Sequence, residues 1–328
     1  MRGVALGACD RPLVERYDAG LFDLDGVLYL GDQPVQHAAP SVRAARAAGM
    51  QAAFVTNNAS RRPAAVAAHL TELGIPAQPP DVITSAQAAV RLLGGRVAPG
   101  AGVLVLGSAG LAEEVELGGF RPVRSADRSV AAVVQGYDRD TGWAQLAEAC
   151  VALRAGAIWI ATNVDSTLPS PRGPLPGNGA MVAALRTATG LEPVVAGKPE
   201  PPLLRESVDR VAARQPLVLG DRLDTDVLGA VRTGLDSLLV LTGVVDLAAA
   251  LLAPTGSRPT YISADLRGLL EAHPLVEIEG ETARCQAAAS TYAGGRVSVQ
   301  DESVPALRAA CALAWHCADS GLPIDGPA

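Results

Sequence analysis

The stretch from residue 19 to residue 25 constrains this chain most, because a short apolar run ends abruptly in two aspartates, Asp23 and Asp25. An apolar run bounded by polar residues predicts an interior strand of a parallel sheet. In open α/β sheets, ligands bind beyond the carboxyl ends of the strands. We therefore expect both carboxylates at a ligand site, and a turn in which they cap the next segment is the alternative interpretation of this motif alone.

Three later segments repeat the arrangement of an apolar run followed by polar residues. In chain order, the polar residues are Thr56, Asn57 and Asn58 after residues 52–55, Lys198 after residues 194–197, and Asp221, Asp224 and Asp226 after residues 216–220. Pro199 disfavours helical geometry at Lys198, because a proline restricts the residue before it. We expect the carboxylate pair, the hydroxyl, the lysine and the carboxylate cluster to converge.

Composition limits the classes of protein to which the chain can belong. With 328 residues, of which 49% are hydrophobic and 19% charged, it can bury a sizeable core and form two or three domains. The formal net charge of -7 offers no general attraction to nucleic acid or to anionic membranes. Five scattered cysteines without a C-x-x-C spacing indicate neither a disulfide framework nor a thiolate zinc site, so we expect a cytoplasmic protein.

The chain shows no pattern typical of export or of a membrane span. The first 18 residues lack a sustained apolar stretch before a cleavage site, so we expect no signal peptide. The most apolar segment, residues 237–254, is interrupted by Asp246 and is shorter than the roughly 20 residues that a span requires. We expect no transmembrane helix and no membrane or nucleic-acid partner.

Alternating strand and helix patterns predict an α/β fold in which one domain is inserted into another. We expect a doubly wound, mainly parallel sheet as the core, in residues 1–83 and 194–260. Residues 84–193 have their own alternation and predict an inserted α/β cap domain. Residues 261–328 predict a small C-terminal α+β appendage that covers the edge or rear of the core, with regulation or oligomerisation, as in a homodimer, as alternative roles.

The segments DLDG, TNN, GKP and GDRLDTD resemble, in order, the four motifs of the haloacid dehalogenase superfamily of phosphotransferases. The resemblance covers roughly residues 18–245. The long insertion between the second and third motifs is similar to that of the branch containing phosphoglycolate, glycerol-phosphate, pyridoxal-phosphate and nucleotide phosphatases. This resemblance specifies the reaction more closely than the substrate, and it implies a phosphoric monoester hydrolase.

The resemblance implies a catalytic role for each of the motif aspartates. Asp23 is the expected nucleophile, which forms an aspartyl-phosphate, and Asp25 is the expected general acid and base. The implied cofactor is Mg²⁺, a hard cation that binds through carboxylates and substrate phosphate. Its implied ligands are Asp23, the backbone carbonyl of Asp25 and Asp221, with Asp226 supporting the site. Asp224 lies off the motif and is interpreted as a helix-start residue.

The implied phosphate-binding residues are Thr56, Asn57 and Lys198. The first two supply donors to phosphoryl oxygens, and the lysine neutralises the charge that builds on them. Thr56 as a strand-end cap and Lys198 as a solvated cation at a helix start are the alternatives. The loop at residues 161–179 of the cap offers four polar candidates for substrate specificity, although its density of glycine and proline is also typical of any tight loop. These candidates are Asn163, Asp165, Arg172 and Asn178.

The substrate implied by the family is a small phosphorylated metabolite. Residues 163–179 contain no aromatic side chain to stack on a base or pyridine ring, whereas their polar side chains suit hydroxyl groups. We expect glycerol 3-phosphate first and 2-phosphoglycolate second, with a pyridoxal-phosphate or nucleotide phosphatase as the alternative. A non-catalytic phosphate sensor is the alternative from another class, and Asp25 argues against it because binding alone needs no second protic carboxyl.

Overall fold

The structure is a computed structural model that describes residues 6–168 and 172–328. The predicted cap loop is therefore described only on either side of residues 169–171, and the first five residues of the predicted core also lie outside the described part. The chain divides into two compact units. Unit 1 contains the chain up to Val55, Ala68–Ala77 and the residues from Ser207 onward, and unit 2 contains Thr56–Ala67 and Gln78–Glu206.

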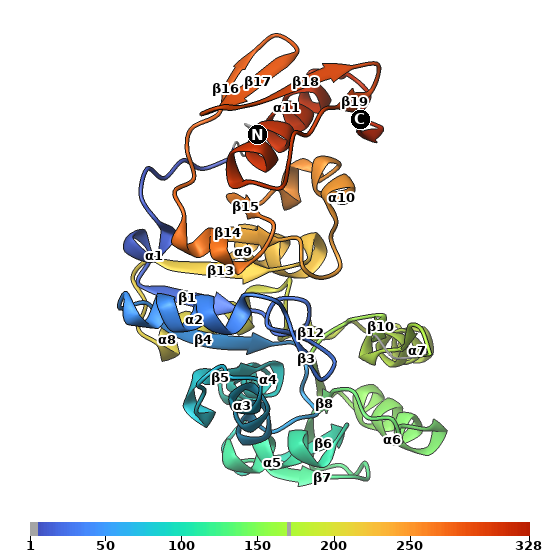
Figure 1. The fold of residues 1–328 in the computed structure, drawn as a ribbon. Helices are drawn as coiled ribbons and strands as arrows, with labels where there is room; N and C mark the ends of the chain where they lie inside the picture. Colours follow the sequence, from blue (N-terminus) through green and yellow to red (C-terminus); the bar gives the residue numbers. More distant parts are fainter. Residues whose placement is uncertain (1–5, 169–171) are drawn as a thin grey trace. The chain divides into compact units, whose positions relative to one another are not determined.

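A parallel sheet forms the centre of unit 1 (Figure 1). Its strands follow the order β15-β14-β13-β1-β4, and each neighbouring pair is parallel. They are β1 (Ala19–Phe22), β4 (Gln51–Thr56), β13 (Pro216–Gly220), β14 (Asp236–Val240) and β15 (Tyr261–Ser263). Every residue of β1 and β13 is buried, because strands covered on both faces are apolar throughout.

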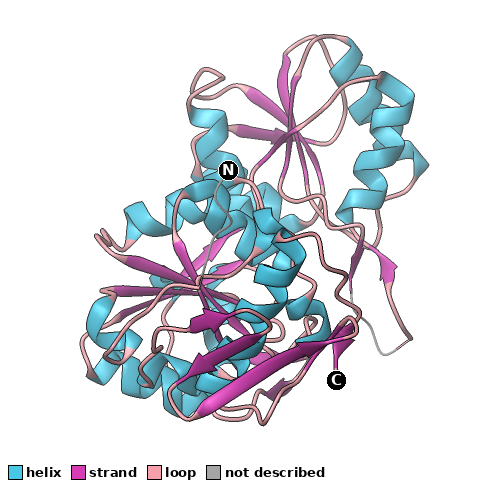
Figure 2. Cartoon of the chain, turned by 90° about the horizontal axis from the view of Figure 1, so that it is seen from above, coloured by secondary structure: helices cyan, strands magenta, loops and turns pink. Residues whose placement is uncertain are grey.

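Helices lie on both sides of this sheet (Figure 2). The helical elements of this part of unit 1 are α1 (Leu13–Arg16), α2 (Ala38–Ala47), the π-helical turn η2 (Leu223–Val227), α9 (Leu228–Thr233), α10 (Leu247–Leu251) and the short 3₁₀ turns η3 (Thr255–Ser257) and η4 (Leu266–Leu270). After β1 the chain forms a hairpin of β2 (Tyr29–Leu30) and β3 (Gln33–Pro34). Helix α2 ends before Gly49, whose φ of +95° suits glycine at that position.

The C-terminal residues of unit 1 form a second sheet that packs on a long helix. The strand order is β16-β17-β18-β19-β20, and helix α11 (Val304–Asp319) lies against β17 and β18. The strands are β16 (Glu277–Glu279), β17 (Thr282–Cys285), β18 (Ala288–Ala293), β19 (Arg296–Val297) and β20 (Gly326–Pro327). Leu313 and Trp315 of α11 join one apolar cluster with Leu239 and Ile262 of the parallel sheet. The segment therefore covers the core of unit 1.

Unit 2 has its own parallel sheet, in the order β12-β9-β8-β6-β7. The strands are β6 (Gly102–Leu106), β7 (Arg121–Val123), β8 (Val130–Gln135), β9 (Ile158–Ala161) and β12 (Val194–Val195), and the cap loop adds the hairpin of β10 (Thr167–Leu168) and β11 (Leu175–Pro176). The helices are α4 (Ser85–Gly94), α5 (Ala109–Leu117), α6 (Trp143–Arg154) and α7 (Asn178–Thr189). The turn η1 (Pro79–Asp81) and strand β5 (Val82–Thr84) precede α4, and α3 (Pro63–Glu72) and α8 (Pro201–Arg210) continue from one unit into the other.

The α/β fold class with parallel sheets is confirmed, whereas two segments lie in elements other than those expected. Val194–Val195, expected in the second core segment, pairs with β9 in unit 2. Tyr261–Ser263, expected in the appendage, forms the edge strand β15 beside β14. The division into 1–83, 84–193, 194–260 and 261–328 stays a proposal. Within the described residues, we find no helix long and apolar enough to cross a membrane.

Candidate active site

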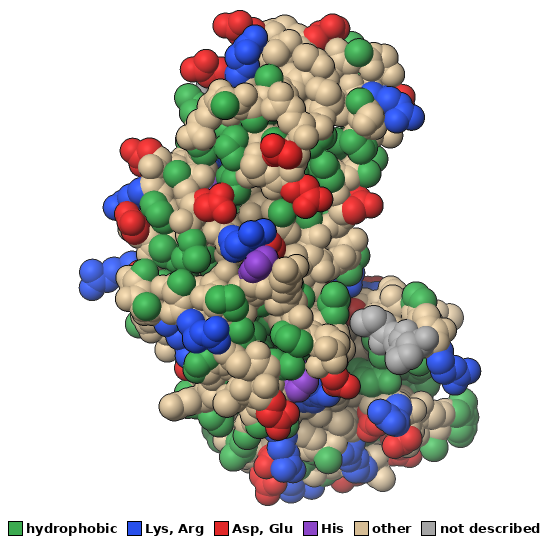
Figure 3. All heavy atoms as spheres, in the orientation of Figure 1, with side chains coloured by type: hydrophobic (Ala, Val, Ile, Leu, Met, Phe, Trp, Pro, Cys, Tyr) green, Lys and Arg blue, Asp and Glu red, His purple; other side chains and the backbone are tan. Residues whose placement is uncertain are grey.

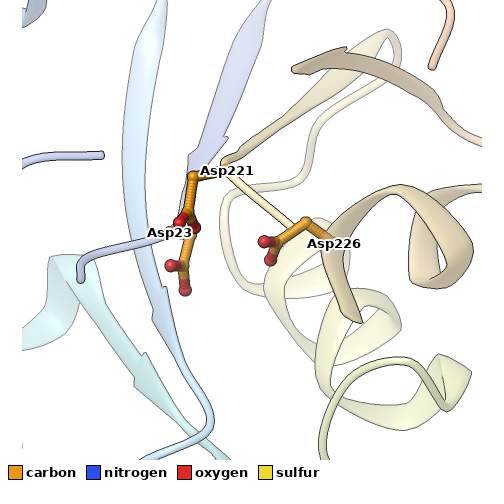
Figure 4. A group of neighbouring side chains, drawn as sticks. All are labelled: Asp23, Asp221 and Asp226. Atoms are coloured by element: carbon orange, nitrogen blue, oxygen red, sulfur yellow. The ribbon is translucent and has the colours of Figure 1, made fainter. Parts of the chain in front are cut away.

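Three aspartates of unit 1 form a compact carboxylate cluster (Figure 4). One oxygen each from Asp23, Asp221 and Asp226 lies within 4.8 Å of the others. Asp23 follows β1 and Asp221 follows β13, and these strands are parallel neighbours, so their carboxyl ends coincide. The backbone N–H of Asp23 donates to the carbonyl of Leu219 at 2.8 Å and extends this pairing. The sheet thus brings together residues almost 200 positions apart.

The Asp221 side chain is held in place by tight backbone packing. Its Oδ2 accepts a hydrogen bond from the backbone N–H of Val244 at 2.6 Å, and its carbonyl accepts one from Val245 at 3.1 Å. A Cβ added at Gly26 or at Gly243 would collide with the carboxylate, so both positions require glycine. Gly26 also has a φ of +87°, which glycine adopts at low cost. The surroundings fix the direction of this carboxylate.

Asp226 is positioned by the π-helical turn η2. The backbone N–H of Val227 donates to the carbonyl of Arg222 at 3.1 Å, five residues back, and this bond defines the turn. The Arg222 N–H is 3.3 Å from Oδ2 of Asp226, which is buried. Asp224, on the same turn, is exposed and accepts two bonds from the Arg222 side chain, which lowers the pKa of that carboxyl. The turn therefore places Asp226 in the buried cluster and Asp224, which lies off the motif, in solvent.

Asp25 lies next to this cluster in sequence but is exposed and outside it. The loop around it is fixed by backbone bonds: Gly26 donates to the carbonyl of Tyr29 at 2.8 Å, and the Thr242 hydroxyl donates to the carbonyl of Gly26 at 2.6 Å. An exposed carboxyl in a fixed loop can exchange protons with solvent. This arrangement suits the acid-base function expected of Asp25.

The cluster suits a hard divalent cation. Three carboxylates this close repel one another, and the repulsion is stronger where water is scarce. Oxygen-only donor sets select Mg²⁺, Ca²⁺ or Mn²⁺ over zinc and copper. Because Asp221 and Asp226 are almost wholly buried, the bound cation would be screened little by solvent. The residues present therefore fit the expected Mg²⁺ site.

The expected phosphate-binding residues lie together in unit 2. Thr56 ends β4, is buried, and its Oγ1 accepts a bond from the backbone N–H of Asn58 at 3.1 Å. Lys198 is buried as well. Its backbone N–H donates to Oδ1 of Asn57 at 2.8 Å, and its carbonyl accepts from Nδ2 of the same side chain at 2.9 Å. The second and third motifs are thus joined directly.

The four residues expected to determine specificity differ in what they contact. Asn163 is buried and donates to the carbonyl of Asn57 at 2.8 Å, and Asn178 is buried and donates to the carbonyl of Asn163 at 2.7 Å. Both amides therefore hold the loop together. Asp165 is partly buried and accepts from Nδ2 of Asn57 at 3.2 Å, and Arg172 is exposed.

Ser85 helps to hold the backbone of Asn57 in the candidate site, although it lies outside the four motifs. Its hydroxyl is buried and donates to the carbonyl of Asn57 at 2.6 Å. It lies at the start of α4, where Thr84 is the N-cap, so the sequence indicates only a helix start there. The motifs likewise give no indication of Gly243 and Val244, which hold the Asp221 carboxylate after β14.

Comparisons with known proteins agree with this arrangement. A model of the haloacid dehalogenase-like hydrolases matches residues 20–121, and a second, for related hydrolase-like sequences, matches residues 195–269. The chain is 53% identical over 268 residues to D-glycerol 3-phosphate phosphatase of Mycobacterium tuberculosis, covering 82% of this chain and 75% of that protein. It is 34% identical to an acid sugar phosphatase of Staphylococcus saprophyticus, covering 79% of this chain and 98% of that protein.

A solved structure extends the similarity to the C-terminal residues. The crystal structure of glycerol phosphate phosphatase from Mycobacterium tuberculosis in complex with magnesium superposes with a TM-score of 0.82 and 46% identity, covering 93% of this chain and 92% of that one. The motifs, the parallel sheets and these similarities agree. The chain belongs to the haloacid dehalogenase-like hydrolase family.

Proposed function

We propose that the protein is a Mg²⁺-dependent phosphomonoester hydrolase that acts on glycerol 3-phosphate through an aspartyl-phosphate at Asp23. The observation that carries this proposal is the cluster of Asp23, Asp221 and Asp226 at the end of the parallel sheet. When bound there, Mg²⁺ would offset the charge of the carboxylates and of the phosphate. Asp23, the backbone carbonyl of Asp25 and Asp221 are its proposed ligands, and Asp226 supports them.

The proposed reaction has two steps. A carboxylate oxygen of Asp23 attacks phosphorus and the bond from phosphorus to the alkoxide oxygen breaks, while Asp25 gives its proton to that oxygen. Asp25 then accepts a proton from water, whose oxygen attacks phosphorus and releases Asp23 and inorganic phosphate. The exposure of Asp25 supports this exchange of protons.

Thr56, Asn57 and Lys198 are the proposed phosphate-binding residues. Because Oγ1 of Thr56 already accepts the Asn58 N–H, its own hydrogen is directed elsewhere and can be donated. Both polar atoms of the Asn57 side chain bind Lys198, so we assign the donor role of Asn57 to its backbone N–H. Burial of Lys198 strengthens the attraction of its ammonium for a phosphoryl oxygen.

Glycerol 3-phosphate is the proposed substrate because the 53% identical relative from Mycobacterium tuberculosis is a D-glycerol 3-phosphate phosphatase. The absence of aromatic side chains from the sequence of residues 163–179 supports a small polyol phosphate over a nucleotide or pyridoxal phosphate. Phosphoglycolate is the second proposed substrate. Asp165 and Arg172 are the described loop residues that we retain as specificity candidates, with Asn163 and Asn178 acting through the fold of the loop.

We also propose that the protein is cytoplasmic and acts without a membrane or nucleic-acid partner. All five cysteines are free, which fits a reducing compartment. Acidic and basic side chains are both scattered over the face seen in Figure 3, and the net charge is -7, so neither supports binding to a polyanion. A homodimer formed through the C-terminal segment is a further proposal, supported by the exposed side chains of Leu275 and Leu322.

A panel of phosphate esters at one Mg²⁺ concentration tests the proposed activity. Glycerol 3-phosphate, 2-phosphoglycolate, pyridoxal phosphate and a nucleoside monophosphate are compared by kcat/KM from released phosphate. We expect glycerol 3-phosphate to be preferred, and chelation to abolish turnover until Mg²⁺ is restored. A lead of more than about tenfold, or 1.4 kcal/mol, by pyridoxal phosphate or the nucleotide would refute the substrate assignment.

A further inference from the structure

The side chain of Asn57 makes hydrogen bonds with both the backbone N–H and the backbone carbonyl of Lys198. The Lys198 N–H donates to Oδ1 at 2.8 Å, and Nδ2 donates to the Lys198 carbonyl at 2.9 Å. Such a two-point contact resembles the pairing of neighbouring β-strands, which fixes position as well as distance. Lys198 and Asn57 are 141 residues apart, so this contact joins the third motif to the second, while pairing of β12 with β9 holds the strand that precedes the lysine.

The orientation of the Asn57 amide is set by Asp165. An amide nitrogen carries two hydrogens, and the hydrogen not used on Lys198 is directed to Oδ2 of Asp165 at 3.2 Å. An ionised carboxylate can only accept hydrogen bonds, so the Asp165 side chain favours the amide orientation in which Nδ2 of Asn57 points towards it. In that orientation Oδ1 of Asn57 points towards the Lys198 N–H and accepts from it. A Cβ at Gly197 would lie 2.6 Å from Oδ1 of Asn57, so a glycine is needed for this close approach.

The backbone of Asn57 is itself held firmly. Its carbonyl accepts the Ser85 hydroxyl at 2.6 Å and Nδ2 of Asn163 at 2.8 Å, and both donors are buried. The amide that grips Lys198 therefore projects from a fixed point. By contrast, the side chain of the neighbouring Asn58 is turned to Ser60, where it accepts from the backbone N–H at 2.8 Å.

We infer that Asn57 and Asp165 form a positioning pair, which sets the place from which the Lys198 ammonium meets the transferring phosphoryl group. This inference rests on the proposed function. It gives Asp165 the task of orienting Asn57, in addition to any contact with substrate. Stabilisation of charge in a transition state depends steeply on geometry, so a shifted lysine backbone lowers the rate more than the affinity for substrate.

The first test compares Asn57→Ala with the matched control Asn58→Ala. We measure kcat and KM for glycerol 3-phosphate, and Ki for vanadate, which imitates the transferring phosphoryl group. For Asn57→Ala we expect kcat to fall at least about thirtyfold and the vanadate Ki to rise at least about tenfold, with KM changed by less than about threefold. Asn58→Ala should stay within about threefold of the wild type in all three.

The vanadate Ki distinguishes a role of Asn57 in positioning Lys198 from a role in folding, because Ki does not depend on the fraction of enzyme molecules that are folded and active. A purely structural role for Asn57 would lower kcat through loss of folded enzyme and leave Ki unchanged. An unchanged Ki for Asn57→Ala overturns the inference, and so does an equal rise for Asn58→Ala.

A second variant pair tests the contribution of Asp165. Asn57→Asp keeps an acceptor for the Lys198 N–H but places two carboxylates side by side, so we expect a loss at least as large as that of Asn57→Ala. Asp165→Asn removes the repulsion and supplies a donor, so the double variant should recover at least about tenfold in kcat over Asn57→Asp. Strictly additive losses would show that the two residues do not act as a pair.

Vanadate binding to the Mg²⁺-loaded protein, measured by calorimetry, distinguishes failure of the inference from failure of the proposed function. If the wild type binds vanadate but hydrolyses no phosphate ester, the proposed function fails. In that case the vanadate dissociation constants of Asn57→Ala and Asn58→Ala still test the positioning pair: weaker binding by Asn57→Ala alone supports it, and equal binding by both variants overturns it. If the wild type binds no vanadate at all, both are overturned.

Discussion

At the residue scale, one short segment places carboxylates in opposite environments. Asp221 and Asp226 are almost fully buried and share a cluster with Asp23, whereas the Asp224 side chain is 69% exposed. The difference comes from the π-helical turn, in which Asp224 faces solvent whereas Thr225, Asp226 and Val227 are buried. Residue type alone therefore cannot identify a metal ligand here, and the position on the turn does.

Asp221→Asn and Asp224→Asn should separate these environments by metal dependence. We expect Asp221→Asn to raise the Mg²⁺ concentration for half-maximal turnover at least about tenfold, because a neutral amide attracts the cation less. Asp224→Asn loses only an exposed pair with Arg222 and should leave the Mg²⁺ titration unchanged. Equal titrations for the two variants would require another ligand in place of Asp221.

His273 is a buried residue whose charge state affects stability. Its Nε2 lies 2.9 Å from the carbonyl of Gly268, and its Nδ1 has no hydrogen-bond partner among the described residues. Burial, with the nearby positive charge of Arg308, lowers the pKa of His273 to about 4. The folded protein therefore keeps the ring neutral, while the unfolded chain binds a proton near pH 6.5.

This difference predicts a loss of stability in mild acid. The contribution of His273 is fully present above about pH 6.5 and is lost as the pH falls through about 4, because the unfolded state binds the proton first. Between pH 7 and pH 5 the free energy of unfolding should fall by about 2 kcal/mol more in the wild type than in His273→Gln. Urea unfolding of both proteins at the two pH values measures this, and parallel losses would contradict it.

At the scale of elements, helix α11 is fastened to the core of unit 1 by Arg258. The guanidinium is buried and donates to both carboxylate oxygens of Asp319 at 2.6 and 2.8 Å, and it lies 5.4 Å from the ring centroid of Trp315. The same pairing lowers the pKa of Asp319. The Trp315 indole N–H also donates to the carbonyl of Ala250 on α10 at 3.0 Å.

Arg258→Met should loosen this helix measurably. The methionine keeps the apolar stem but loses two hydrogen bonds to Asp319, one to the Ala253 carbonyl and the ring contact, so we expect the free energy of unfolding to fall by about 1–3 kcal/mol. The matched control is Arg186→Met, which breaks the exposed pair with Glu192 and should cost less than about 1 kcal/mol. Denaturant unfolding compares them, and equal losses would show that Arg258 does not fasten α11.

The sequence predicted elements with strong periodicity better than short ones. Helix α11 was predictable from its apolar positions, and β1 and β13 from uninterrupted apolar runs. The two-residue strand β12 and the three-residue strand β15 were not placed in their sheets, because two or three residues are too few to show a hydrophobic periodicity. Their assignment depends on neighbouring strands far away in the chain.

At the scale of the whole molecule, the motifs predicted well which site residues would lie together. They predicted less well which groups each of those residues would contact. Asp23, Asp221 and Asp226 of unit 1 lie together as expected, whereas Asp25, expected to converge with them, lies outside the cluster. Asn57, Asn163 and Asn178 were expected to meet substrate, yet their side chains bind the protein's own backbone. An asparagine serves either purpose equally well, so only the three-dimensional contacts show which backbone groups it binds.

The central claim is that Asp23 of unit 1 is the nucleophile of the proposed phosphate-ester hydrolysis. Turnover of glycerol 3-phosphate by the wild type and by Asp23→Asn, in Mg²⁺ and at matched folded fraction, tests it most directly. The amide has nearly the same shape but cannot attack phosphorus, so we predict a loss in kcat of at least about a thousandfold, or 4 kcal/mol. Retention of more than about a tenth of the wild-type rate, a loss below 1.4 kcal/mol, would contradict the account.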